Sequence, residues 1–295
     1  MPSELLDGLR RHDRRALARL ITLASRGQHI DEIRNQLGPP SARAHVIAVT
    51  GSAGVGKSTL VGKLIEQLRQ HGKSVAVLAC DPQSPLTGGA LLGDRFRMAG
   101  ASDDAAVFNR SLAAASGRQA VADHLDTVIL LCEHFGFDFV LIETVGAGQG
   151  DTAFHSLADA VVLLLQPETG DDLQWEKAGV LEVADIIVIH KADLPGADKA
   201  AAQIKSALEL AGGREIPVLL ASSRTGAGMK ELAALLESLP TRSRNGGAAA
   251  ELLFLAQQEL ATRFRTPGIE TLAVDWQAGR ITTAEALRRV FRAQE

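Results

Sequence analysis

One stretch decides the fold: Gly51-Ser52-Ala53-Gly54-Val55-Gly56-Lys57-Ser58-Thr59. It follows an apolar run at residues 46–49 and matches the pattern G-x-x-x-x-G-K-[S/T], which joins a strand to a helix. The glycines let consecutive backbone N–H groups surround phosphate oxygens, and the positive N-terminus of the next helix adds to the attraction. The stretch therefore predicts a phosphate-binding loop, in which Lys57 reaches the β- and γ-phosphates and the Ser58 hydroxyl coordinates Mg²⁺.

Around this loop, apolar runs alternate with helical patterns from residue 45 to about residue 240. The runs that predict strands lie at residues 45–50, 74–79, 139–142, 160–165, 186–189 and 218–220. Nearly continuous Val, Ile and Leu is typical of parallel strands covered on both faces, and the helical patterns between them favour right-handed crossovers. The predicted fold class is α/β: a P-loop NTPase with a mostly parallel sheet flanked by helices.

Helical extensions precede and follow this part of the chain. Leucines at helical spacing in residues 1–37 predict two short amphipathic helices, which end at Gly38-Pro39-Pro40. Residues 241–249 have the composition of a flexible joint, and residues 250–293 carry two further helical patterns. We therefore expect an N-terminal helical extension at 1–40, a P-loop domain at 41–240 and a C-terminal helical arm at 241–295.

The composition of the chain argues against several classes of binding partner. The chain has 295 residues, a net charge of −4 and 4% aromatic residues, which argues against nucleic-acid binding, since that usually needs a basic face and stacking rings. Two cysteines are too few for a disulfide scaffold or a four-cysteine metal site. No apolar run reaches the ~18–20 residues of a membrane span, and the N-terminus lacks a secretory pattern. We expect a cytoplasmic protein that binds neither nucleic acid nor membrane.

Two acids are candidates for holding the magnesium. Glu143 ends a predicted strand, where it can bind a magnesium-bound water, and Gly146 can offer its N–H to the γ-phosphate. Asp81 follows the strand predicted before it, on the sheet edge where α/β ligand sites form. It is a candidate magnesium residue or an orienter of the attacking water, although an Asp before Pro also commonly begins a turn.

The residues predicted to recognise the nucleotide base lie late in the chain. Residues 190–193 resemble the N-K-x-D guanine box, with His190 in place of Asn. Asp193 can accept hydrogen bonds from guanine N1–H and N2–H₂ together, a pair of donors that adenine lacks. Lys191 would cover the purine face, and His190 would replace part of the bonding of Asn, which affects affinity more than base identity. The purine pocket would be completed by Ser222, Ser223 and Arg224.

Further stretches resemble one family, the MeaB/ArgK GTPases, which include the methylmalonic aciduria type A protein. They are Cys80-Asp81-Pro82 with residues 87–98, Glu143-Thr144-Val145-Gly146-Ala147-Gly148-Gln149, and residues 166–179. The resemblance covers most of residues 1–240. It implies a GTPase that is a chaperone of adenosylcobalamin-dependent acyl-CoA mutases, gates cofactor delivery, and protects or reactivates the mutase. It also implies a homodimer formed through terminal segments, with cobalamin contacted only through the mutase.

Carried over by position, the resemblance places Asp94 in switch I, as a catalytic and magnesium residue, and ends switch II at Gln149. The residues that it implies for switch contacts and mutase coupling are Arg97, Asp171, Gln174 and Lys177. No glutamine follows Gly146 directly, at the spacing expected for a water-orienting residue. We therefore expect slow hydrolysis by the chain alone, accelerated when the mutase orders Arg97, Lys177 or Gln149 near the γ-phosphate.

Three other classes of protein stay open at this point. A P-loop also serves kinases and ATPases that act on small molecules or transport proteins, although the guanine box and the paired acids favour a switch. A nickel-insertion GTPase would use clustered Cys and His, whereas the histidines here are scattered. A scaffold with a purely structural nucleotide is the non-catalytic alternative. The sequence leaves the client mutase open.

Overall fold

The computed structural model describes residues 2–82, 104–114, 124–144, 154–167, 184–212, 215–242 and 267–292. The chain divides into two compact units, residues 1–242 and residues 243–295. In the described part of the chain, no helix combines the length and the apolar character needed to cross a bilayer.

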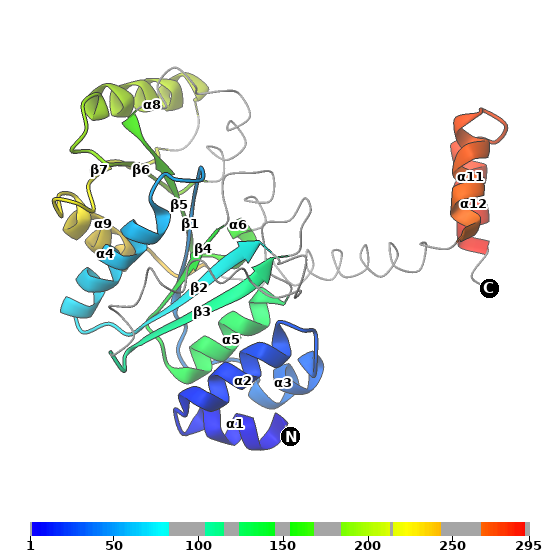
Figure 1. The fold of residues 1–295 in the computed structure, drawn as a ribbon, viewed down its shortest axis with the longest axis horizontal. Coiled ribbons are helices and arrows are strands. Elements are labelled where there is room, and N and C mark those ends of the chain that lie inside the picture. The colour runs from blue at the N-terminus through cyan, green and yellow to red at the C-terminus, as the bar shows by residue number, and fades with distance from the viewer. Residues whose placement is uncertain are drawn as a thin grey trace. The chain divides into compact units, whose positions relative to one another are not determined.

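A parallel β-sheet forms the centre of the first unit (Figure 1). Among the described residues it has seven strands in the order β3-β2-β4-β1-β5-β6-β7, and every neighbouring pair is parallel. The strands are β1 His45–Gly51, β2 Val75–Pro82, β3 Val107–Ala114, β4 Phe139–Glu143, β5 Ala160–Leu165, β6 Ile186–His190 and β7 Val218–Ala221. The predicted α/β class and the six predicted strands are confirmed.

Two details of the predicted sheet were wrong. The sequence analysis missed β3, because this strand is not a continuous apolar run: Asn109, Arg110 and Ser111 interrupt it. It also placed Asp81 after a strand that ended at residue 79. Asp81 lies inside β2, because β3 extends the ladder and pairs Asp81 with Ala113.

Helices cover both faces of the sheet. On one face, α4 (Lys57–Gln70) and α9 (Met229–Ser238) pack against alternate residues such as Ile47 and Val49 of β1. On the other face lie α5 (Leu125–Phe135) and α8 (Ala197–Ala211). The short helix α6 (Phe154–Leu157) precedes β5. Burial on both faces accounts for the continuous apolar runs of the central strands.

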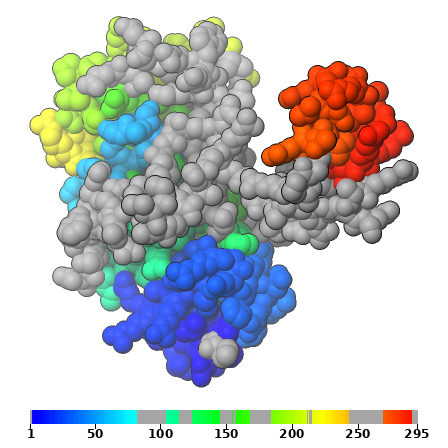
Figure 2. Space-filling model, turned by 45° about the vertical axis from the view of Figure 1, so that its right-hand side comes forward, coloured from blue at the N-terminus to red at the C-terminus, as the bar shows by residue number. Residues whose placement is uncertain are grey.

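Three helices precede the sheet, not the two that the sequence predicted: α1 Pro2–Arg10, α2 Arg14–Ala24 and α3 Ile30–Leu37. The two predicted leucine patterns correspond to α1 and α2, and α3 was missed because Ile33 is its one buried residue and its apolar pattern is short. Asp13 accepts a hydrogen bond from the backbone N–H of Arg15 at 2.8 Å and starts α2. Leu6, Leu9 and Leu17 are fully buried in the same core cluster as α5. In Figure 2 the three helices form one continuous blue surface.

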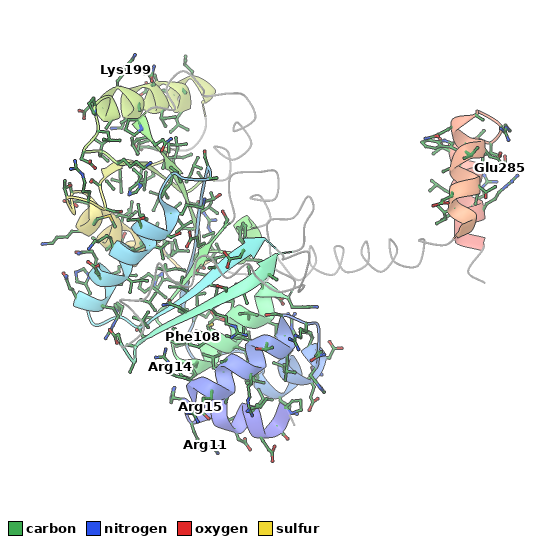
Figure 3. The ribbon with its side chains drawn as sticks, in the orientation of Figure 1. Arg11, Arg14, Arg15, Phe108, Lys199 and Glu285 are labelled. Carbon is green, nitrogen blue, oxygen red and sulfur yellow. The ribbon has the colours of Figure 1, made fainter. Side chains whose placement is uncertain are left out.

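An arginine attaches these helices to the sheet. The Arg14 guanidinium donates to the carbonyls of Ala105 at 2.8 Å and Val107 at 2.6 Å, and it lies 5.7 Å from the centre of the Phe108 ring (Figure 3). These contacts satisfy backbone acceptors at the start of β3. The N-terminal helices therefore share both a core and polar contacts with the sheet.

The first unit ends at a buried polar anchor beside the amino ends of the strands. Asp159 accepts hydrogen bonds from the backbone N–H groups of Val46 at 2.8 Å and Arg242 at 2.7 Å. Asp185 accepts from the N–H of Val161 at 2.8 Å and pairs with the Arg242 guanidinium. Both acids are buried, so these bonds compensate for the water that the carboxylates lose. The anchor holds residue 242 at the end of the sheet where the central strands β1 and β5 begin.

The second unit contains a helical hairpin of α11 (Pro267–Gln277) and α12 (Thr283–Arg292). The Trp276 indole donates to the Thr283 hydroxyl at 3.1 Å across the hairpin. Large apolar side chains remain exposed on it: Val274 by 56%, Trp276 by 48% and Leu287 by 52%.

Candidate functional site

The phosphate loop connects β1 to α4 and has the backbone that the motif requires. Gly51 has φ +149° and Gly56 has φ +102°, conformations that L side chains rarely adopt. A Cβ atom at Gly51 would lie 2.6 Å from the Leu164 carbonyl oxygen, and one at Gly56 would lie 2.6 Å from His190 Cε1. Glycine is therefore required at both positions, for conformation and for space. Of the other loop residues, Ala53, Gly54 and Thr59 are exposed, whereas Val55 is buried.

Lys57 begins α4, and its side chain turns back across the loop. Its ammonium donates to the carbonyls of Gly51 at 3.0 Å and Ser52 at 3.2 Å, and only 7% of the residue is exposed. A buried ammonium is costly unless acceptors surround it. The loop carbonyls thus hold a positive charge at the helix N-terminus, the place where phosphate is expected.

Ser58 and Glu143 meet at the carboxyl ends of the strands. The Ser58 hydroxyl donates to Glu143 Oε1 at 2.5 Å. The register explains the contact, because Glu143 of β4 pairs with Val49 of β1 on one side and with Ala79 of β2 on the other. A hydroxyl and a carboxylate are suitable partners for Mg²⁺ and its waters, which are usually held by one or two carboxylates together with phosphate. These residues fit the ion that the sequence implies.

Asp81 shares the sheet face of Glu143. It lies two residues beyond Ala79 on β2, and side chains two apart in a strand point to the same face. The same alternation puts both acids on the face that α4 covers, and each is less than a tenth exposed. No three Cys, His, Asp or Glu side chains gather as a metal-binding group in the part of the chain that the structure describes.

His190 links two loops of the site. Its Nδ1 lies 2.8 Å from the Val55 carbonyl oxygen, and its Nε2 lies 2.8 Å from the Ser223 hydroxyl. Because a carbonyl can only accept, Nδ1 carries the proton, and Nε2 of the neutral ring accepts from Ser223. The imidazole therefore joins the phosphate loop to the loop after β7 and uses both ring nitrogens to do so.

Because His190 is buried, its protonation affects the stability of the folded chain. Desolvation is the main cause that lowers the pKa of His190 below its ordinary value, and the nearby charge of Lys191 lowers it further. The hydrogen bond to Val55 and the charge of Asp193 raise this pKa but do not reverse the shift. As the pH falls, His190 is protonated in the unfolded chain before it is protonated in the folded chain, which favours unfolding. The contribution of the neutral His190 to the free energy of unfolding is therefore complete above about pH 6.5 and is lost as the pH falls toward the folded pKa.

The first prediction follows from this shift. Urea unfolding between about pH 7 and pH 5 should show a larger loss of unfolding free energy for the wild type than for His190→Asn, which cannot titrate. Equal losses in the two proteins would contradict a buried neutral imidazole. Asp193, whose pKa is lowered by Ser222 and then by Arg224, changes stability only at lower pH.

The other residues of the guanine box also touch neighbouring loops. The Lys191 ammonium donates to the Gly54 carbonyl at 3.2 Å and to Gln166 Oε1 at 2.9 Å. The sequence analysis assigned no role to Gln166 in this site; its position directly after the β5 strand was the available signal. Asp193 accepts from the Ser222 hydroxyl and from Arg224 Nε, the latter at 2.8 Å. The structure thus brings the guanine box, the loop after β7 and the phosphate loop together.

Seven of the predicted functional residues lie outside the described residues. They are Asp94, Arg97, Gly146, Gln149, Asp171, Gln174 and Lys177.

The site combines a phosphate loop with Asp193, the acid that the sequence predicted would select guanine, and comparison with known proteins gives the family. A family model described as methylmalonyl Co-A mutase-associated GTPase MeaB matches residues 17–263. The chain belongs to the MeaB family. The name fits the resemblance that the sequence predicted, and the GTPase character of the family implies that this MeaB protein binds guanine nucleotide.

Relatives of this MeaB family member cover different parts of it. A Pyrococcus horikoshii protein that carries a GTPase name is 42% identical over 78% of this chain and 74% of its own. The methylmalonic aciduria type A homolog of Mus musculus is 38% identical over 70% of this chain and 50% of its own. A fused isobutyryl-CoA mutase of Cupriavidus metallidurans is 39% identical over 66% of this chain and 18% of its own.

A solved structure shares the fold of this MeaB family member. A LAO/AO transport system kinase matches it with a TM-score of 0.74 at 24% identity, covering 99% of this chain and 96% of that one. Identity at this level shows the fold alone, and the predicted fold of a mostly parallel sheet flanked by helices is confirmed.

Proposed function

We propose that this MeaB family member is a GTP-hydrolysing metallochaperone that gates adenosylcobalamin delivery to a B12-dependent acyl-CoA mutase and protects or reactivates it. The observation that carries the GTPase part is the junction between the guanine box and the phosphate loop. His190 bonds to the Val55 carbonyl and Lys191 to the Gly54 carbonyl. A guanine recognised by Asp193 is thereby kept at a fixed place relative to the phosphate loop.

The mutase part of the proposal is supported by the relatives. The family model is described as mutase-associated, and a segment similar to this chain occurs within a protein named as a fused isobutyryl-CoA mutase. We propose that the client is a mutase of this class, such as methylmalonyl-CoA or isobutyryl-CoA mutase. Adenosylcobalamin would reach this chain only through that partner.

The chemistry is phosphoryl transfer to water, which needs positioning and charge neutralisation more than covalent catalysis. Bound Mg²⁺ would supply positive charge to the β- and γ-phosphates. Ser58 and Glu143 would hold the ion together with Asp81 and Asp94, and Lys57 would hold the β- and γ-phosphates. The backbone of residues 51–59 would surround the phosphates, and Gly146 would donate its N–H to the γ-phosphate. Gln149 would take part in hydrolysis when the partner orders it.

The switch segments would change conformation when hydrolysis removes the γ-phosphate and the contacts that they make with it. In the proposal, Arg97, Asp171, Gln174 and Lys177 couple the switch segments to the mutase.

The C-terminal arm at residues 241–295 is proposed as the dimerisation element of a cytoplasmic homodimer. The exposed Val274, Trp276 and Leu287 of the helical hairpin support this, because they are large apolar side chains that a protein contact could bury. A chain truncated after residue 245 should therefore have the mass of a monomer in solution; an unchanged dimer would exclude the arm as the contact.

Titration calorimetry with GDP and with ADP, both in the presence of Mg²⁺, tests the nucleotide part. We expect GDP to bind and ADP to bind far more weakly, because adenine offers Asp193 no pair of donors. A preference for ADP would instead support the kinase or ATPase alternative, for which the structural comparison supplies only the fold.

The partner part is tested by GTP hydrolysis measured alone and with methylmalonyl-CoA mutase or isobutyryl-CoA mutase. One of the two should raise the rate. Equal rates with and without both enzymes would contradict coupling to either of these mutases.

A further inference from the structure

The carboxylate that is expected to select guanine is already engaged by an arginine. Ser222 donates its hydroxyl to Asp193 Oδ1. Arg224 Nε donates to Asp193 Oδ2 at 2.8 Å, and Arg224 Nη2 lies 2.6 Å from the same oxygen. Each oxygen of an ionised carboxylate accepts about two hydrogen bonds. Oδ2 is therefore filled by Arg224. Oδ1 holds Ser222, and the backbone N–H of Asp193 also bonds to the carboxylate, so at most one acceptor position stays open.

The guanidinium of Arg224 has the same hydrogen-bonding pattern as the edge of guanine that Asp193 is expected to bind. The edge of guanine formed by N1–H, C2 and the N2 amine is a guanidine group, with two parallel N–H donors. The Nε and Nη2 atoms of Arg224 present the same planar pair to a carboxylate. Guanine needs two acceptor positions on Asp193, one for N1–H and one for N2–H₂. Since at most one position is open, at least one Arg224 contact must break for guanine to bind.

The two partners of this ion pair differ in how firmly they are held. The Asp193 side chain is 13% exposed and is fixed by Ser222. The backbone N–H of Ser222 bonds in turn to the Ala227 carbonyl at 2.9 Å. The Arg224 side chain is 74% exposed, and among the described residues Asp193 is the partner of its guanidinium in hydrogen bonding and ion pairing. The arginine can therefore leave while the carboxylate stays in place.

We propose that Arg224 is a specificity-determining residue that occupies the guanine-selecting carboxylate of the free chain and is displaced by the N2 amine of guanine. This inference rests on the proposed guanine site. It distinguishes guanine from hypoxanthine, which has N1–H but lacks the amine. Hypoxanthine needs one acceptor position fewer than guanine, so guanine displaces more of the Arg224 contacts.

The experiment compares Kd values for GDP and IDP, with Mg²⁺ present, in the wild type and in Arg224→Ala. We expect Arg224→Ala to bind GDP about two- to fivefold more tightly, the range set by an exposed ion pair. Its affinity for IDP should rise less, so the ratio of the GDP affinity to the IDP affinity rises. Arg10→Ala is the matched control, because Arg10 forms an exposed ion pair with Asp7 at 2.8 Å on α1. It should leave both Kd values unchanged.

Two results would overturn this role. Weaker binding of both GDP and IDP to Arg224→Ala would mean that the guanidinium stacks on the purine. An unchanged GDP affinity would mean that the ion pair does not compete with the base. A wild-type chain that binds no GDP is a different outcome: it would overturn the proposed function, and the role of Arg224 with it.

Discussion

Replacing Lys57 with alanine is expected to lower the rate of GTP hydrolysis by about a hundredfold or more, the effect typical of removing one group that neutralises charge in the transition state. The ammonium is buried within the phosphate loop and bonds to the carbonyls of Gly51 and Ser52. No neighbouring cation in the described part of the loop can take its place, because residues 51–56 are all uncharged. The measurement is single-turnover hydrolysis of GTP with the protein in saturating excess over the nucleotide and with Mg²⁺ present.

Two further variants make this result specific to the ammonium. Lys57→Met keeps the buried alkyl stem and should lose as much activity as Lys57→Ala, with an unfolding transition close to that of the wild type. Lys63→Ala removes a lysine of the same helix that pairs with Glu66 at the surface, and it should hydrolyse GTP at the wild-type rate. Normal hydrolysis by Lys57→Met would exclude the proposed role of the charge.

Replacing Glu143 with glutamine is the second change with a large expected effect. It keeps the size of the side chain but removes the negative charge beside Ser58. Groups that orient a metal and its ligands typically contribute about 10- to 100-fold to metal affinity or activity. We expect a loss of activity of that order and a higher Mg²⁺ concentration for half-maximal rate.

The control for this change is Glu66→Gln, which neutralises an exposed acid on α4. It should leave both the rate and the Mg²⁺ requirement unchanged. If Glu143→Gln lowered the rate without changing the Mg²⁺ requirement, the acid would have to act on something other than the ion.

The sequence predicted the central strands well, because burial on both faces leaves a continuous apolar run that few other structures produce. It failed at β3, where the polar residues Asn109 to Ser111 interrupt the run. It also missed α3, because this helix of 8 residues buries Ile33 alone and so leaves only a weak apolar pattern. Elements with a long, uninterrupted buried apolar pattern were therefore predicted, and elements with an interrupted or short one were missed.

At the site, the phosphate loop was predictable because its residues are consecutive and the geometry is set by the motif itself. The contacts between loops were not. His190 meets Ser223 and Lys191 meets Gln166 only because β6 lies between β5 and β7, and no single segment contains that strand order. The pairing of Arg224 with Asp193 depends further on the conformation of one exposed side chain. The roles assigned to these residues stay predictions for the experiments above.

The anchor formed by Asp159, Asp185 and Arg242 has a practical consequence for measuring motion. It lies where β1 and β5 begin, whereas the phosphate loop follows the end of β1, a strand of 7 residues. At ~3.3 Å per residue the two places are roughly 20 Å apart along that strand. Rearrangement of the loops during a catalytic cycle can thus proceed at one end while the other stays still. A spin label near Arg242 would give a stationary reference against which displacements of the nucleotide loops could be recorded.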